Sequence, residues 1–476
     1  MLKSAPDTLS TMENKVAIIG AGLAGSEAAL QLALRGINVV LYEMRTVRMT
    51  DVHKTANCGE LVCSNSLKST KAASAAGMLK EELSVLDSQL YGIALENSVP
   101  AGGALAVDRV AFAEAVTSAI ESCPLVELRR QEVSDIGALA ADCDAVVVAT
   151  GPLTSDALAE SLSRIIGSEY LAFYDAAAPI VMADSLDMNV LFRQSRYEDG
   201  GDGSQQRGDY LNAPFSKEEY EAFIDELLNA DRVVARDFES RDLFQACQPI
   251  EEIARAGRDA PRFGPLKPVG LVDPRTGKRP WAALQLRAED VEGSCYNLVG
   301  FQTNLKFPEQ KRVFGMIPGL QNADFARYGV MHRNTFVDAP RLLDSSLRLK
   351  SEGARELDAP IFVAGQLSGT EGYCEAIRSG LHVALSVTAF LHGIDLPKMP
   401  SETAFGALID YATSPETDSY QPMHVNFGIM PQFEQRIRNK AQRYEAYAER
   451  GRCALREYLE RLEEAGLMEV RACLRA

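Results

Sequence analysis

The feature that most constrains the fold of this chain is a strand, a glycine-rich turn, a helix and a second strand in direct succession near the N-terminus. Residues 15–20 form an apolar run typical of a buried strand, and residues 20–25 read Gly-Ala-Gly-Leu-Ala-Gly. A helical pattern follows to about Arg35, and residues 38–42 form another apolar run that finishes at Glu43. This order predicts a βαβ unit of the kind that binds a dinucleotide.

The glycines of this turn and the acid after the second run are the expected dinucleotide contacts. Gly20 and Gly22 allow backbone N–H groups to approach a pyrophosphate, and the N-terminus of the following helix attracts its charge. Glu43 lies close to the offset of about 20 residues beyond Gly25 at which such folds place a ribose-binding acid. We therefore predict that a bound dinucleotide contacts four residues of this unit: Gly20, Gly22, Gly25 and Glu43.

Two later apolar runs indicate that this dinucleotide is FAD. The run that begins at Asp144 ends in Ala-Thr-Gly, as in many flavoproteins with two dinucleotide folds, and makes Thr150 and Gly151 candidate contacts. A further run ends at Gly365 and Gln366, where the closing flavin motif usually has an Asp after its glycine. Gln366 can still hydrogen-bond a ribityl hydroxyl, although it carries no charge.

A helical pattern over residues 373–390 follows this last run. If the helix begins beneath the isoalloxazine, its positive end favours the anionic reduced flavin. Tyr373 would then lie at the flavin itself, and a tyrosine in a surface loop is the alternative interpretation.

The arrangement of these patterns predicts an α/β chain with a Rossmann-like, doubly wound FAD-binding domain and an inserted α+β substrate domain. The 476 residues exceed the usual size of one domain. After the Ala-Thr-Gly run, the alternation of strands and helices is not continued until about residue 293. The expected parts are a flexible leader (1–14), the first part of the FAD domain (15–155), the inserted domain with Cys247 (156–293) and the second part with a helical C-terminal tail (294–476).

Composition limits where the protein acts and what it binds. No run approaches the roughly 18 uncharged apolar residues of a membrane span, and no signal peptide is recognisable, so we expect no membrane contact. The nine cysteines form neither a CxxC pair nor a small disulfide framework, and this favours reduced thiols in the cytoplasm. We also expect no metal site. A formal charge of −17 argues against a generic surface for nucleic acid, so any RNA contact must be a local basic patch.

Basic residues gather in two places, and by pattern alone the C-terminal set is more often a solvated helix face. One cluster lies in the expected insertion and the other near the C-terminus. They comprise Arg255, Arg258, Arg262, Lys267, Arg275, Lys278 and Arg279, and Arg436, Arg438, Lys440, Arg443, Arg450, Arg452 and Arg456.

Two cysteines stand in motif-like settings. Cys63 lies in Glu-Leu-Val-Cys-Ser-Asn, and Cys247 lies in Phe-Gln-Ala-Cys-Gln-Pro-Ile-Glu. By spacing alone, each is more often a buried structural cysteine than a nucleophile.

The sequence closely resembles the TrmFO family from about Lys15 to at least Arg443. The segments that carry the resemblance are residues 20–29, 41–45, 60–67, 99–108, 174–179, 185–188, 264–270, 328–335 and 371–373. Members of this family are FAD- and methylenetetrahydrofolate-dependent methyltransferases that act on C5 of the T-loop uridine of bacterial tRNA. The resemblance therefore implies FAD as cofactor, methylenetetrahydrofolate as one-carbon donor, NAD(P)H as electron source and tRNA as substrate, with no obligatory protein partner.

The resemblance also assigns roles to individual residues. It implies that Cys247 is the nucleophile that adds to uracil C6, because C5 of uracil is a poor nucleophile unaided. It implies that Cys63 is a second catalytic thiol near the flavin, and that Arg45 belongs to the cofactor site. Cys58, in an Asn-Cys-Gly where relatives usually have Phe-Ala, is a nearby thiol with which Cys63 could be confused.

Two other functions remain open. The same chemistry on a ribosomal RNA uridine is compatible with every motif, because nothing in the sequence reads a base sequence. A wobble-uridine modifying flavoenzyme of the MnmG type also combines an FAD fold, an insertion and paired cysteines, but such chains are longer and their glycine motif differs.

Overall fold

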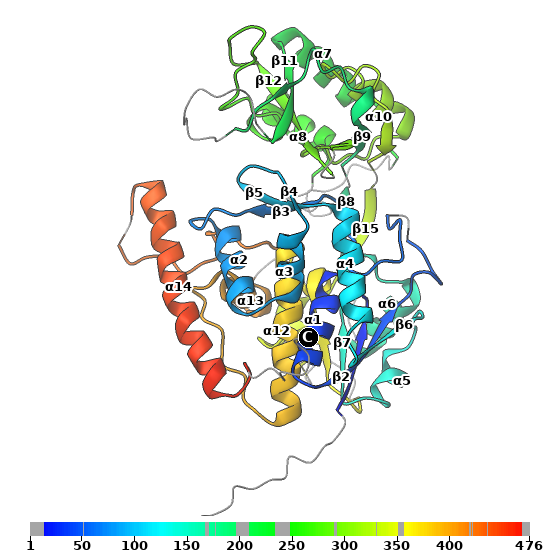
Figure 1. The fold of residues 1–476 in the computed structure, drawn as a ribbon, viewed down its shortest axis with the longest axis vertical. Helices are drawn as coiled ribbons and strands as arrows, with labels where there is room; N and C mark the ends of the chain where they lie inside the picture. The colour runs from blue at the N-terminus through cyan, green and yellow to red at the C-terminus, as the bar shows by residue number, and fades with distance from the viewer. Residues whose placement is uncertain are drawn as a thin grey trace, which may run out of the picture.

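A computed structural model of the chain describes residues 14–50, 52–166, 171–176, 178–196, 209–233, 248–289, 293–329, 331–350, 357–417, 420, 422–435 and 437–468. The chain forms a larger lower unit and a smaller upper unit, stacked along the long axis of the molecule (Figure 1). Two antiparallel strands run between them, β8 (Leu171–Ala176) and β15 (Met331–Phe336). Of the predicted leader only Asn14 is described, and Cys247 lies outside the described residues.

A five-stranded parallel sheet forms the centre of the lower unit. In spatial order its strands are β16 (Ile361–Val363), β7 (Ala145–Val148), β1 (Lys15–Ile19), β2 (Asn38–Glu43) and β6 (Val126–Arg130). Successive side chains of β1 enter different hydrophobic clusters, since Val16 and Ile18 lie in one and Ala17 in another. Both faces are buried, which explains the continuous apolar runs of the sequence. The predicted α/β fold with a parallel sheet is confirmed.

Two helices cross closely beside this sheet. α1 (Leu23–Leu34) is the helix after the glycine turn, and α12 (Tyr373–His392) packs against it. At the crossing, a Cβ on Gly380 would lie 2.1 Å from the carbonyl oxygen of Ala24, so only glycine permits this approach. The crossing fixes the start of α12 relative to the glycine turn.

Further elements surround the lower sheet. They are the helices α2 (Ala75–Val85), α3 (Gln89–Glu96), α4 (Arg109–Glu121), α5 (Ile136–Ala140), α6 (Asp156–Ile166), α11 (Ala339–Leu342), α13 (Ala404–Thr413) and α14 (Lys440–Glu464), the short 3-10 turns η1 (Gly151–Leu153) and η4 (Gly365–Ser368), and a small sheet of β3 (Ser66–Ser69), β5 (Ala104–Val107) and β4 (Ser98–Val99). The small sheet faces the upper unit (Figure 1). The predicted C-terminal tail contains α14, which buries Tyr447, Leu455 and Tyr458 in the lower core.

The upper unit is a six-stranded antiparallel sheet packed on helices. In spatial order the strands are β10 (Phe192–Arg193), β11 (Tyr210–Phe215), β12 (Ala282–Ala288), β13 (Cys295–Leu298), β9 (Ile180–Met182) and β14 (Phe325–Arg327), and the helices are α7 (Lys217–Asn229), α8 (Ile250–Ala256), α9 (Ala260–Phe263) and α10 (Phe307–Phe314), with the turn η2 (Ala183–Ser185). Ser216 and Glu219 form a capping box at the start of α7. Phe215, Phe223 and Phe301 form part of the core.

The ends of the upper unit differ from the expected 156–293. α6 belongs to the lower unit, because its Leu158 and Leu162 are buried in the lower core. β13 pairs with β12 and with β9, and β14 pairs with β9, so the upper sheet continues to Arg327. The two pairings with β9 join segments far apart in the sequence, and no local pattern marks them.

No helix within the part of the chain that the structure describes has the length and apolar character needed to cross a membrane.

Candidate cofactor and catalytic site

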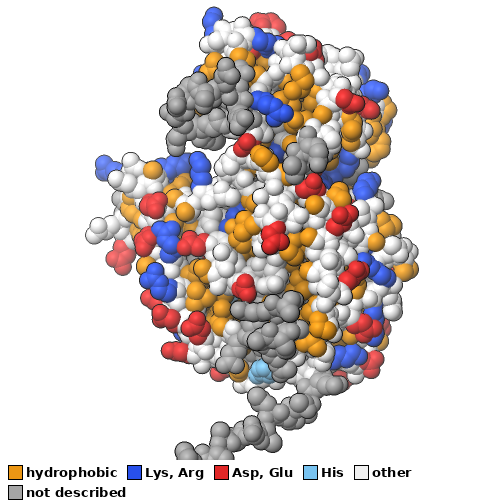
Figure 2. All heavy atoms as spheres, viewed as in Figure 1, with side chains coloured by type: hydrophobic (Ala, Val, Ile, Leu, Met, Phe, Trp, Pro, Cys, Tyr) orange, Lys and Arg blue, Asp and Glu red, His pale blue; other side chains and the backbone are white. Residues whose placement is uncertain are grey.

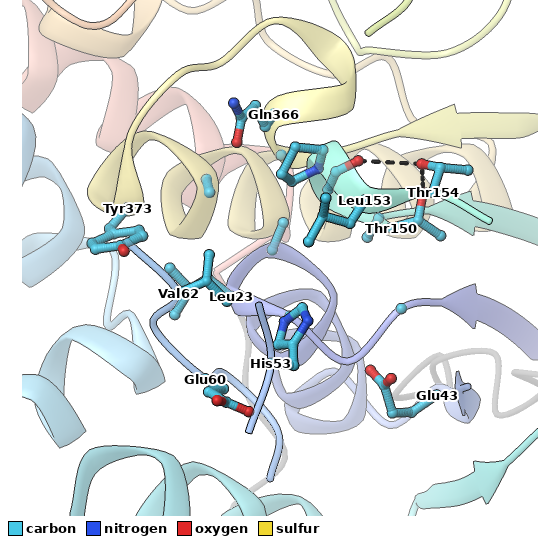
Figure 3. A pocket seen from close by; sticks show the side chains of 18 of the residues that line it. Leu23, Glu43, His53, Glu60, Val62, Thr150, Leu153, Thr154, Gln366 and Tyr373 are labelled. Atoms are coloured by element: carbon cyan, nitrogen blue, oxygen red, sulfur yellow. Dashed lines mark hydrogen bonds between the residues drawn. The ribbon is translucent and has the colours of Figure 1, made fainter. Parts of the chain in front are cut away.

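A cavity of about 380 Å³ lies at the carboxyl ends of the parallel strands. Residues at or within two positions of the ends of four strands line it: Gly20 after β1, Glu43 at the end of β2, Thr150 after β7 and Gly365 after β16. Figure 3 shows Tyr373 and Glu43 on opposite sides of this cavity, with Leu23 between them. Ligands of open α/β sheets bind in this position.

The three glycines of the turn have different structural roles. Gly20 has a φ of +102°, and an added Cβ would lie 2.6 Å from the carbonyl oxygen of Ala149. A Cβ on Gly25 would lie 1.9 Å from the carbonyl oxygen of Gly20. A Cβ on Gly22 would have no atom within 4 Å. The protein's own packing therefore requires glycine at the first and third positions, whereas at Gly22 the space is open and available to a ligand.

The helix behind this open space is suited to bind an anion. Gly22 is the N-cap of α1, and no side chain caps the helix there. The first N–H groups of a helix carry a partial positive charge and need acceptors from outside the helix. Gly22 and the start of α1 therefore form an open cradle that is able to hold a phosphate group.

Glu43 is buried and bound by its neighbour Arg45. Oε1 accepts hydrogen bonds from Arg45 N at 3.0 Å and Nε at 2.9 Å, and Oε2 accepts from Ala21 N and Arg45 Nη2, both at 3.0 Å. Burial opposes ionisation of Glu43, but the hydrogen bonds and charge of Arg45 lower the pKa of its carboxyl. Glu43 therefore holds the glycine turn to the end of β2 as an ionised carboxylate.

Thr150 and Gly151 lie on the cavity wall at the end of β7. Thr150 Oγ1 and Thr154 Oγ1 are 2.7 Å apart, as the dashed line in Figure 3 marks. Gly151 has a φ of +64°, and a Cβ there would meet nothing within 4 Å. This wall also leaves room for a ligand.

Gly365 and Gln366 close the cavity on the side of β16. Gly365 N donates to Ser379 Oγ of α12 at 2.7 Å, which fixes the turn. The Gln366 Nε2 amide is buried and has no hydrogen-bond partner among the described residues. A buried donor of this kind requires an acceptor, and a ligand in the cavity can supply it.

Tyr373 and Cys63 lie together at one end of the cavity. The Tyr373 hydroxyl accepts hydrogen bonds from Cys63 N at 2.9 Å and Ser64 N at 3.0 Å. Burial, with the neighbouring Cys63, raises the pKa of Tyr373, so its hydroxyl stays protonated. The tyrosine is therefore a cavity residue rather than a surface one, and it orients the backbone that carries the Cys63 thiol.

The other cysteines near the site have different surroundings. The cysteines of the described residues are all free thiols. Cys58 and Cys374 are buried, and burial raises the pKa of each to about 11. Thiols with such pKa values are protonated at neutral pH and react slowly. Cys63 is the cysteine that lines the cavity, and Cys58 is a core residue.

Three arginines that the sequence analysis did not single out hold the Cys63 loop. Arg327, at the end of β14 in the upper unit, donates to the carbonyl oxygens of Val62 at 3.0 Å and Cys63 at 2.9 Å. Arg287 of β12 donates to Asn65 Oδ1 at 2.7 Å. In the lower unit, Arg109 donates to Leu61 O at 3.0 Å and pairs with Glu289 at 2.7 Å. The loop is therefore fixed from both units. No local sequence signal marks these contacts, because the partners are distant along the chain.

Lys68 and His424 also line the cavity. Lys68 Nζ lies 2.9 Å from Glu375 Oε1. Burial, with the nearby Lys68 charge, lowers the pKa of His424. This histidine is therefore neutral at physiological pH and can accept or donate one hydrogen bond.

Cys247 lies outside the described residues, but the chain that follows it is anchored near the cavity. Ile250 N donates to Gln302 O at 2.8 Å, and Gln302 lines the cavity. Glu251, at the start of α8, accepts hydrogen bonds from Thr303 Oγ1 at 3.0 Å and Asn304 N at 2.6 Å. The acid of the Cys-Gln-Pro-Ile-Glu segment is thus a buried structural residue that holds α8 to residues 302–304.

Comparison with known proteins places the chain among close relatives. Residues 15–395 match a family model described as glucose inhibited division protein A. The chain is 48% identical over 449 residues to the methylenetetrahydrofolate–tRNA-(uracil-5-)-methyltransferase TrmFO of Desulforamulus reducens, covering 94% of this chain and 98% of the relative. It is 48% identical over 451 residues to the TrmFO of Listeria monocytogenes, covering 95% and 100%.

A solved structure supports the fold. GidA of Aquifex aeolicus superposes with a TM-score of 0.65 at 17% identity, over 96% of this chain and 77% of that chain. At this level of identity the match supports the architecture alone.

Proposed function

Because this chain belongs to the TrmFO family of methylenetetrahydrofolate–tRNA-(uracil-5-)-methyltransferases, we propose that it methylates uracil C5 in tRNA with FAD as its bound cofactor. The single observation that carries the cofactor assignment is the cavity across the carboxyl ends of the parallel strands, with open space at Gly22. The finer parts of the proposal are the T-loop uridine as target and NAD(P)H as electron source. A tRNA substrate in turn implies a reaction in the cytoplasm.

The residues of the cavity fit FAD. The open cradle at Gly22 and the uncapped start of α1 suit the pyrophosphate. The buried Gln366 amide donor suits a ribityl hydroxyl. Glu43 fits a ribose contact less directly, because both of its carboxylate oxygens already accept hydrogen bonds from Ala21 N and Arg45. We therefore assign Glu43 and Arg45 together to the nucleotide site.

The chemistry of the bound flavin is transfer of the one-carbon unit and of two electrons. Tyr373 and Gln366 border the part of the cavity that faces the Cys63 loop, and we assign them to the flavin ring and ribityl chain. The positive end of α12, which begins at Tyr373, would favour negative charge on a reduced flavin bound beside it. His424 and Lys68 line the same end and are available to bind the folate or the uracil.

The uracil ring needs activation by a thiolate. We assign this step to Cys247: its sulfur bonds to C6, and the electron pair of the C5–C6 double bond becomes available at C5 to bond the one-carbon unit. A base then removes the C5 proton while the bond between the one-carbon unit and its donor breaks, which leaves an exocyclic methylene on C5. A hydride equivalent derived from NAD(P)H would reduce this methylene to the methyl group, and the restored C5–C6 double bond expels the thiolate. Cys247 precedes Ile250 by three residues, a span of at most about 11 Å, and Ile250 is bonded to the cavity residue Gln302.

Cys63 is the candidate for the second catalytic thiol. It lines the cavity beside Tyr373, and its backbone is held from both units. Two roles fit this position: acceptance of the C5 proton, or protection of the one-carbon unit from water. Cys58 fits neither role, because it is buried in the core with a raised pKa.

The test is methyl transfer from labelled methylenetetrahydrofolate to an unmodified tRNA transcript in the presence of NAD(P)H. We expect Cys247→Ala to abolish transfer while the purified protein keeps the flavin spectrum of the wild type, since the cavity residues are unchanged. Cys453→Ala is the matched control, because Cys453 is an exposed thiol on α14. Methylation by Cys247→Ala would remove the nucleophile assignment, and methylation that requires S-adenosylmethionine would overturn the proposed function.

The target is tested with the same assay on three RNAs: the unmodified tRNA transcript, a T-loop variant of it and a ribosomal RNA transcript. A T-loop variant in which the uridine is replaced by cytidine should not accept a methyl group. Transfer to a ribosomal RNA transcript but not to tRNA would favour the same chemistry on a different substrate.

A further inference from the structure

The upper unit has a second cavity, of about 640 Å³, beside Trp281 at the start of β12. The opposite end of this strand carries Arg287, which is bonded to Asn65 in the Cys63 loop. A strand of seven residues spans about 20 Å. The second cavity therefore lies roughly this far from the Cys63 loop and is distinct from the cofactor site.

The lining of this cavity is strongly basic. Its cationic residues are Lys217, Arg262, Arg275, Lys278 and Arg279, against two acids. Both acids have internal roles: Glu219 accepts from Ser216 N in the capping box of α7, and Asp273 pairs with Arg275 at 2.8 Å. The surplus of positive charge contrasts with the formal charge of −17 of the whole chain.

Two of the cations have no competing acid. Lys278 and Arg279 are exposed, and within the described ranges no carboxylate lies within 4.0 Å of either. In Figure 2, by contrast, acidic and basic side chains are interspersed over the visible surface of the lower unit. The second cavity is therefore a local site at which an anion can be bound without displacing an internal ion pair.

Aromatic rings lie among these charges. The Arg262 guanidinium lies 3.7 Å from the ring centroid of Trp281, and its Nε donates to Trp281 O at 2.8 Å, so its plane is fixed. Phe263 does not line the cavity but is adjacent to it: its ring centroid lies 5.8 Å from the Arg262 guanidinium, and its side chain is 74% exposed. Sites that bind single-stranded nucleic acid combine such exposed rings, on which bases stack, with cations that contact the backbone.

We propose that this second cavity anchors a segment of the RNA substrate remote from the reacting uridine, with Lys278 and Arg279 on phosphates and Phe263 against an unpaired base. The inference rests on the proposed action on RNA. A separation of about 20 Å is more than half a turn of a duplex, so the anchored nucleotides and the target belong to different parts of one folded RNA.

The test uses the flavin-loaded protein and an unmodified tRNA transcript. Trp281 is the single tryptophan of the chain, so its emission reports directly on this cavity. We expect tRNA to change the emission of the wild type. We expect the double variant Lys278→Ala/Arg279→Ala to bind about tenfold or more weakly, with the slope of log Kd against log salt reduced by about 2, one for each lost phosphate contact. In the methylation assay, KM should rise while kcat at saturating tRNA is kept.

The matched control is Arg255→Ala/Arg258→Ala, in the same basic stretch of sequence. Both residues are ion-paired, Arg255 with Glu252 and Arg258 with Asp225, and neither lines the cavity. We expect tRNA affinity and salt slope to stay as in the wild type.

The outcomes separate the two proposals. Unchanged affinity and salt slope in the Lys278/Arg279 variant, with methylation intact, would overturn this inference and leave the proposed function standing. Binding of tRNA at Trp281 without methylation would overturn the proposed function and keep the inference. A wild-type protein that does not bind tRNA would overturn both.

Discussion

Substitution of Gly22 by Ala should weaken FAD binding without lowering the stability of the apoprotein by more than about 1 kcal/mol. The added Cβ has no protein atom within 4 Å, and Gly22 has an extended, negative φ of −74°. The apoprotein should therefore keep its free energy of unfolding to within about 1 kcal/mol, the usual cost of alanine at an N-cap. The methyl group occupies the space we assign to the pyrophosphate.

The expected effect on FAD follows from the contacts that the methyl group prevents. Loss of about two hydrogen bonds to a charged phosphate, at roughly 1.5–3 kcal/mol each, weakens binding by about 3–6 kcal/mol. This corresponds to an increase in Kd of about a hundredfold to ten-thousandfold. The assay is titration of apoprotein with FAD, followed by quenching of flavin fluorescence, beside urea unfolding of the apoprotein.

Two other glycine variants serve as comparisons. Gly92→Ala, on the exposed side of α3, also has no atom within 4 Å of the new Cβ and should bind FAD normally. Gly25→Ala places its Cβ 1.9 Å from the carbonyl oxygen of Gly20 and should destabilise the apoprotein itself. An FAD affinity of Gly22→Ala within threefold of the wild type would refute the assignment of the pyrophosphate to this cradle.

Two further predictions concern stability and the reacting geometry. Burial raises the pKa of Glu27 to about 7. Between pH 4.5 and pH 7 the folded state keeps this proton while the unfolded state loses it, so the free energy of unfolding should fall by about 3 kcal/mol. Glu27→Gln should remove this part of the pH dependence of the urea midpoint. Arg327→Gln removes the donors to Val62 O and Cys63 O; we expect kcat to fall about a hundredfold and Cys63 alkylation to accelerate, while FAD content stays normal. An unchanged alkylation rate, measured by mass spectrometry, would argue against the positioning role.

The elements that the sequence predicts well are those specified by local patterns. Glycine is required at Gly25 by the nearby carbonyl oxygen of Gly20, and at Gly20 by its positive φ and by Ala149, which follows the adjacent strand of the sheet. The turn, α1 and β2 follow in the predicted order. α12 begins at the predicted Tyr373 and extends two residues beyond the predicted end, to His392. In these segments the apolar period and the helix boundaries agree with the tertiary structure.

The parts that the sequence does not predict depend on contacts between distant residues. The end of the upper unit at Arg327 is set by the pairing of β14 with β9, and residues 294–327 have no pattern that distinguishes them from the lower unit. The contacts of Arg327 and Arg287 with the Cys63 loop span more than 200 residues. Side-chain partners at such separation are fixed only when both units are folded. The environment of Glu43 is also not predicted, although its partner is close in sequence. Its position predicts a ribose contact, whereas Arg45, two residues later, donates hydrogen bonds to both of its carboxylate oxygens.

The hold of Arg287 and Arg327 on the Cys63 loop makes the geometry around this thiol a joint property of both units. A rotation of the upper sheet about β8 and β15 would pull on the backbone of Val62 and Cys63 through two guanidinium groups. Substitutions at the base of the upper sheet can therefore alter turnover without altering any residue that contacts the cofactor. An excised lower unit would keep the parallel sheet and its glycine turn, but its thiol loop would lose the clamps that set its orientation.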